Sequence, residues 1–70
     1  MKFSVIIPLY NEEAIIPELH RRLSESIDRI DGVAEVIFVD DNSADQTFEL
    51  IESVHNRDPR FKAIRLARNF

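Results

Sequence analysis

Residues 35–43, which read E-V-I-F-V-D-D-N-S, decide the fold of this chain. Residues 35–39, with a continuous apolar run over residues 36–39, predict a strand of a parallel sheet, and the run stops abruptly at the acidic pair Asp40 and Asp41. Ser43 with Gln46 three residues later matches a capping box, and Asp45 adds a charge that favours the positive end of a helix. The stretch therefore predicts a buried strand that turns directly into a helix.

Toward the C-terminus, this helix is expected to end before Asp58-Pro59, a turn signal. The residues expected on its inward face are Ala44, Thr47 or Phe48, Ile51 and Val54. Residues 61–66 follow as a third strand. Charges fall on both faces of its alternation, which favours a place at the edge of the sheet.

Toward the N-terminus, residues 3–7 are apolar and β-branched and are closed by Pro8, which predicts a strand buried on both faces. A helix is predicted from about residue 17 to about residue 31, with Pro17 in its first turn and Gly32 at the C′ position. Its apolar stripe recurs every three or four residues and consists of Ile16, Leu19, Leu23, Ile27 and Ile30.

The resulting order β-α-β-α-β predicts an α/β fold, one half of a doubly wound parallel sheet with the spatial strand order three, two, one. Two crossovers of the same hand place both helices on one face of the sheet. The other face and the outer edge of the first strand stay uncovered. Because that strand is apolar, we expect either more chain beyond Phe70 or a homo-oligomer that forms through this edge.

Composition excludes several classes of site. A single glycine, Gly32, rules out both the G-x-G-x-x-G fingerprint and the Walker loop, and the absence of cysteine rules out disulfides and thiolate metal sites. Thirteen acidic against nine basic residues, a net charge of -4, argue against a nucleic-acid partner. No apolar run is long enough for a membrane segment or a signal peptide, so we expect a cytoplasmic location.

Polar clusters follow each predicted strand, over residues 8–13, 40–45 and 65–69. Ligands of open α/β sheets bind at the carboxyl ends of the strands, so these clusters are expected to meet. A tyrosine ring can stack on a base, a carboxylate can accept a base N–H, and an arginine can pair with a phosphate. Together they suit a nucleotide held without a glycine loop. The remaining polar residues are expected to be structural or exposed: Asp40, the turn and cap residues Asn11, Ser43 and Asp45, and the surface residues His20 and His55.

The motifs V-I-I-P-L-Y-N-E-E, V-I-F-V-D-D-N-S-A-D-Q-T and L-A-R-N-F resemble the opening of the family 2 glycosyltransferases, which have the GT-A fold. The R-N-F motif is most similar to the branch of dolichyl-phosphate mannosyltransferases and bacterial polyprenyl-phosphate glucosyltransferases. The resemblance covers essentially the whole chain. It implies that residues 1–70 are a single N-terminal subdomain that binds the donor nucleotide.

The resemblance also implies roles for individual residues. Pro8, Tyr10 and Glu12 would line the base and ribose of the donor, Asp41 would read the base, and Arg68 would lie toward the nucleotide. The family's D-x-D motif, which holds a divalent Mg or Mn ion, and its catalytic base have no counterpart in this chain. The resemblance thus implies a parent enzyme that transfers a sugar with inversion from a UDP- or GDP-sugar, with a polyprenyl phosphate as acceptor. These 70 residues alone are expected to be inactive.

Two other readings remain open at this point. A phospho-acceptor receiver domain also has an acidic pair after a strand, but there the pair follows the first strand and the third strand supplies the phosphorylated aspartate. Here strand three leads into Leu66-Ala67-Arg68. The chain could also be a non-catalytic α/β folding unit that self-associates and has no nucleotide affinity.

Overall fold

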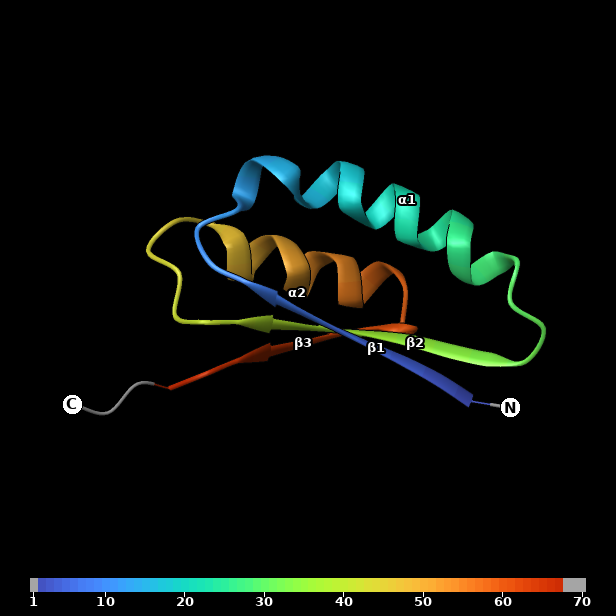
Figure 1. The fold of residues 1–70 in the computed structure, drawn as a ribbon. Helices are drawn as coiled ribbons and strands as arrows, with labels where there is room; N and C mark the ends of the chain where they lie inside the picture. The colour runs from blue at the N-terminus through green and yellow to red at the C-terminus, as the bar shows by residue number, and fades with distance from the viewer. Residues whose placement is uncertain (1, 68–70) are drawn as a thin grey trace.

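The computed structural model describes residues 2–67 and shows three strands and two main helices arranged in two layers (Figure 1). A short 3-10 turn precedes the first helix. In chain order the elements are β1 (Lys2–Leu9), η1 (Glu13–Ile15), α1 (Ile16–Asp28), β2 (Val33–Asp40), α2 (Thr47–Arg57) and β3 (Phe61–Arg65).

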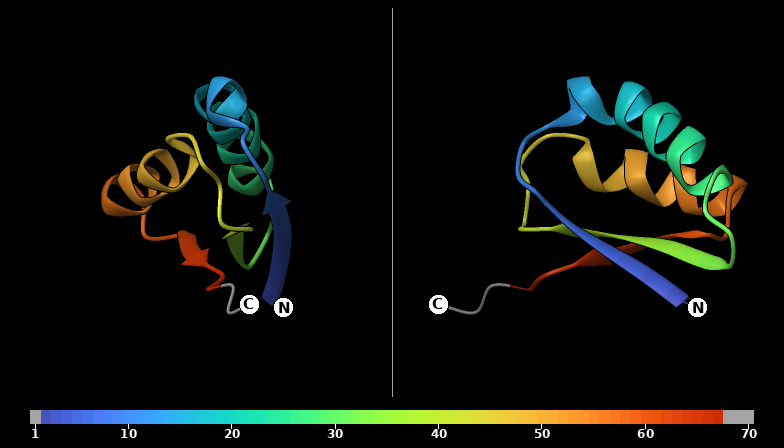
Figure 2. Two further views of the ribbon diagram at one scale, coloured as in Figure 1. Left: turned by 90° about the vertical axis from the view of Figure 1, so that its left-hand side faces the viewer. Right: turned by 45° about the vertical axis from the view of Figure 1, so that its right-hand side comes forward.

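The sheet is parallel, with β2 in the centre and the order β1-β2-β3. Both helices lie on the same side of the sheet in every view (Figures 1 and 2). The predicted strand order and the single helical layer are therefore confirmed. The chain therefore has the α/β half-sheet that its sequence predicts.

The core lies between the sheet and the two helices, and β2 supplies its centre. Val36 and Phe38 point toward the helices and are fully buried, and the Phe38 ring stacks on Phe61 of β3 with ring centroids 5.6 Å apart. Ile51 and Val54 of α2 pack on the same cluster. The helix stripes predicted from their three- and four-residue spacing thus form the core, with the exception of Ala44, which is exposed because it precedes α2.

The second face of the sheet carries no layer within residues 2–67, as its topology predicts. Ile6 is 66% exposed and Ile64 is 47% exposed on it. The expectation that the first strand is buried on both faces was wrong for this chain, because β1 lies at an edge and most of its side chains are exposed. A continuous apolar run indicates a strand that can be buried but does not supply the layer that buries it.

The ends of the helices differ from the predicted ones. Pro17 lies in the first turn of α1 as expected, but α1 ends at Asp28, so Gly32 is not its C′ residue. Instead, Gly32 has a φ of 130° in the turn that leads into β2, a conformation that glycine adopts without a steric penalty.

The predicted capping box is also absent, since α2 begins at Thr47 and not after Ser43. The Ser43 hydroxyl donates to Asp40 and accepts a hydrogen bond from the backbone N–H of Asn11, so it does not cap the helix. The N-cap position is Gln46, which makes no side-chain capping bond; Asp45, one residue earlier, accepts from the Thr47 N–H at its Oδ1, 2.9 Å away. Ser43 is therefore bonded to Asp40 and to Asn11 in the loop after β1, and it does not form the capping box that the local sequence suggests.

Between residues 2 and 67, neither helix combines the length and the apolar composition that crossing a bilayer requires.

Candidate functional site

The carboxyl ends of all three strands meet at one end of the sheet. Leu9, Asp40 and Arg65 are register partners, and each is the last residue of its strand. The Asp41 N–H donates to the Leu9 carbonyl at 2.9 Å, which places the loop after β2 against the end of β1. Tyr10 and Asp41 therefore lie at the same end of the sheet, as the parallel topology predicts.

Four of the five predicted site residues lie at this end. Pro8 is exposed near the end of β1, Tyr10 follows it with 57% of its surface exposed, and Glu12 and Asp41 are half-buried in the two loops. The fifth, Arg68, lies outside the described residues. The arrangement places an accessible aromatic ring at the same end of the sheet as a carboxylate residue of its own loop, Glu12, and one of the loop after β2, Asp41.

Hydrogen bonds join the loop after β1 to the loop after β2, and we call this set the cross-loop clamp. Asn11 donates its backbone N–H to the Ser43 hydroxyl at 2.9 Å, and its Oδ1 accepts from the Ala44 N–H at 2.7 Å. Next along the chain, the Glu12 N–H donates to the Thr47 hydroxyl oxygen at 2.8 Å. The clamp holds together residues that are more than 30 positions apart in the sequence.

Asp45 completes the cross-loop clamp by accepting the Glu13 N–H at its Oδ2, 3.2 Å away. Desolvation acts to raise the pKa of this carboxyl, but the hydrogen bonds from the Thr47 hydroxyl and from the backbone N–H groups of Thr47 and Glu13 outweigh it and lower the pKa. Asp45 is therefore ionised at neutral pH and serves there as an acceptor.

The Asp40 side chain holds the loop after β2 by hydrogen bonds, which is the structural role expected for it. Its side chain is fully buried and accepts hydrogen bonds from the N–H and the hydroxyl of Ser43. Arg65 Nε lies 3.5 Å from Asp40 Oδ2, so the buried carboxylate faces a cation. A buried charge needs such partners to offset the water that it has lost.

Arg65 is a residue whose role sequence reasoning missed. Its Nη2 donates to the Ser43 carbonyl at 3.3 Å, and its guanidinium carbon lies 5.2 Å from the centroid of the Phe48 ring. The only sign of this role in the sequence was that Arg65, a charged residue, occupies a position of β3 whose side chain faces the helices. Thr47, whose hydroxyl holds the Glu12 N–H, was predicted only as a core position.

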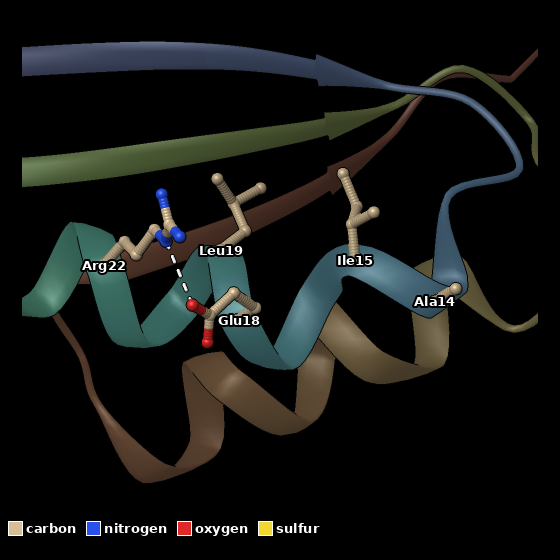
Figure 3. Close-up of a pocket in the computed structure, with 5 residues that line it drawn as sticks. All are labelled: Ala14, Ile15, Glu18, Leu19 and Arg22. Atoms are coloured by element: carbon tan, nitrogen blue, oxygen red, sulfur yellow. Dashed lines mark hydrogen bonds and ion pairs between the residues drawn. The ribbon is translucent and has the colours of Figure 1, made fainter.

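A hollow of about 340 Å³ lies beside α1 and is lined by Ala14, Ile15, Glu18, Leu19 and Arg22 (Figure 3). An ion pair of 3.0 Å joins Glu18 to Arg22 at its margin. Within residues 2–67, none of the predicted nucleotide contacts lines this hollow. The candidate site is therefore the surface formed by the loops at the strand ends, and the hollow is a separate feature.

Among residues 2–67, no three His, Cys, Asp or Glu side chains gather as metal ligands would.

Comparison with known proteins identifies the family. Residues 4–70 match the family described as Glycosyl transferase family 2. An uncharacterized glycosyltransferase of Bacillus subtilis, YkcC, is 39% identical over the whole of this chain, which covers 22% of that protein. An undecaprenyl-phosphate 4-deoxy-4-formamido-L-arabinose transferase of Pseudomonas aeruginosa is 41% identical over 96% of this chain and 20% of its own length.

A solved structure agrees with these relatives. The crystal structure of S. aureus TarS superposes with a TM-score of 0.74 at 40% identity and covers 99% of this chain and 12% of its own. The chain spans about a fifth of the length of the curated relatives described above. From its fold and from these matches, the chain belongs to glycosyl transferase family 2.

Proposed function

We propose that this chain is the donor nucleotide-binding part of an inverting glycosyltransferase that uses a UDP- or GDP-sugar. The observation that carries the proposal is the meeting of Tyr10, Glu12 and Asp41 at one end of the sheet, where α/β folds bind their ligands. A polyprenyl phosphate is the proposed acceptor. The name of the Pseudomonas aeruginosa relative supports this acceptor class.

The proposed roles follow from the chemistry of each side chain. The exposed Tyr10 ring stacks on the base, and the Asp41 carboxylate accepts a hydrogen bond from a base N–H. Glu12 accepts from the ribose hydroxyls, Pro8 lines the same side, and Arg68 pairs with a phosphate. These residues bind and orient the nucleoside diphosphate that departs when the acceptor oxygen attacks the anomeric carbon.

The remaining functions of the enzyme are assigned to residues outside this chain. They comprise the catalytic base and the ligands of a Mg or Mn ion, which stabilises the negative charge of the departing diphosphate. The chain alone is proposed to be inactive as a transferase. We place the enzyme in the cytoplasm, at the membrane that carries its acceptor.

Titration with UDP and GDP, followed by amide NMR, tests the proposal. We expect the signals of Tyr10 and Asp41 to shift with a Kd near millimolar, because about 4.1 kcal/mol is what contacts to a nucleotide without its diphosphate ligands can supply. Asp41→Asn should weaken this binding about tenfold, since it removes a charge-assisted hydrogen bond.

Asp31→Asn is the matched control, because Asp31 is exposed in the turn before the amino end of β2, at the other end of that strand from Asp41. It should leave the Kd unchanged. In a full-length enzyme, Asp41→Asn should raise the donor KM with a smaller effect on the acceptor. Signals of Tyr10 and Asp41 that stay still at tens of millimolar nucleotide would refute the proposal for this chain.

We also propose a second role, self-association through the outer edge of β1. Within residues 2–67 this strand pairs only with β2, and Phe3 and Val5 on it are 42% and 39% exposed. Its unpaired backbone groups and apolar side chains can bind the same edge of a second copy.

Light scattering measures this association directly. We expect a mass of twice 8.2 kDa at high concentration. Phe3→Lys should shift the protein to the monomer, because a charged edge strand resists pairing. Ser26→Lys on the exposed side of α1 should not. A monomer at every concentration would contradict the proposal.

A further inference from the structure

Asn11 lies between two of the residues proposed to contact the nucleotide, Tyr10 and Glu12. Its backbone has a φ of 51°, in the left-handed region that few residues other than glycine and asparagine adopt readily. The chain therefore turns sharply at this position as it leaves β1. The directions of the residues on either side depend on this turn.

The side chain of Asn11 reaches the other loop of the site. Its Oδ1 accepts hydrogen bonds from the backbone N–H groups of Ala44, at 2.7 Å, and Asp45, at 3.4 Å. Its own N–H donates to Ser43 at 2.9 Å. One residue thus satisfies three polar groups of the loop that begins with Asp41.

A second asparagine shows that the left-handed turn alone does not explain these contacts. Asn42 has a φ of 56° and is exposed, but its side chain makes no hydrogen bond within the described part of the chain. The two positions share the same backbone conformation and differ in the cross-loop bonds. Asn42 is therefore a matched control for Asn11.

We propose that Asn11 is a positioning residue that sets the Tyr10–Glu12 loop against the Asp41 loop before nucleotide binds. This inference rests on the proposed nucleotide-binding function. Loops that are already joined lose less conformational freedom when a ligand binds, so the expected effect is on affinity. Because the Asn11 side chain is exposed, the effect on the stability of the fold is expected to be small.

Three variants separate the backbone turn from the hydrogen bonds. Asn11→Gly keeps the left-handed conformation without strain but removes the acceptor, so it should fold and bind UDP about fivefold more weakly. Asn11→Asp keeps an acceptor oxygen and should bind within about twofold of the unchanged protein in salt that screens its added charge. Asn42→Gly should also bind within about twofold.

Amide hydrogen exchange provides the second measurement. Asn11→Gly should speed exchange at the Ala44 N–H, whereas Asn42→Gly and Asn11→Asp should not. Melting temperatures of the two glycine variants should agree within a few degrees, which separates positioning from a loss of stability.

The outcomes are distinct. If the unchanged protein shows no UDP response, the proposed function fails and the positioning role falls with it. If the unchanged protein binds UDP and Asn11→Gly binds equally well, the positioning role is wrong and the proposed function stands. Equal losses in Asn11→Gly and Asn42→Gly would likewise overturn it, because the turn and not the hydrogen bonds would then matter.

Discussion

Phe38→Ala is expected to lower the free energy of unfolding by about 3–5 kcal/mol, the usual cost of removing a buried phenylalanine ring. Phe38 is fully buried on the central strand and its ring stacks on Phe61. A chain of 70 residues has a total stability of about 4–10 kcal/mol, so this one change removes a large share of it. Urea unfolding followed by circular dichroism measures the loss.

Phe3→Ala, measured at concentrations where the chain is a monomer, is the control for this experiment, since it deletes the same ring from a position that is 42% exposed on the edge strand. Its cost should be below about 1 kcal/mol, because much of that ring is already in water. Similar losses for the two variants would mean that the sheet and the helices do not pack around β2 as described.

Arg65→Met is expected to lower the free energy of unfolding by about 2 kcal/mol. The change keeps an unbranched side chain at this position but removes the guanidinium that lies over the Phe48 ring, and it leaves the fully buried Asp40 carboxylate without its cation. Breaking a buried pair costs about 3–5 kcal/mol, and we expect less here because the Arg65 side chain is 42% exposed. The melting temperature should fall by roughly 10 °C.

Lys62→Met also replaces a cationic side chain of β3 by methionine, but at an exposed position. It should change the free energy of unfolding by less than about 0.5 kcal/mol. A double-mutant cycle with Asp40→Asn checks the cause. In the Asp40→Asn background, Arg65→Met should cost less, because the buried charge is no longer there. An unchanged cost would show that Arg65 stabilises the chain through other contacts.

The sequence by itself determined the order of the elements, the topology of the sheet and the end of the sheet where the polar loops meet. Hydrophobic runs and helical spacing are local signals, and the right-handed crossover leaves few ways to join parallel strands. The motifs around Tyr10, Asp41 and Arg68 were enough to indicate the family that the comparisons show.

Only the tertiary structure decided which polar groups pair within the site. Ser43 and Gln46 match a capping box locally, but Ser43 bonds to Asp40 and Asn11 instead, and the Thr47 N–H at the start of α2 bonds to Asp45. The choice depends on a loop 32 residues away, which no local pattern describes. The local pattern of residues 3–7 was likewise misleading about burial, because the exposure of β1 depends on its place at the sheet edge and on the layers around it, and not on the strand's own residues.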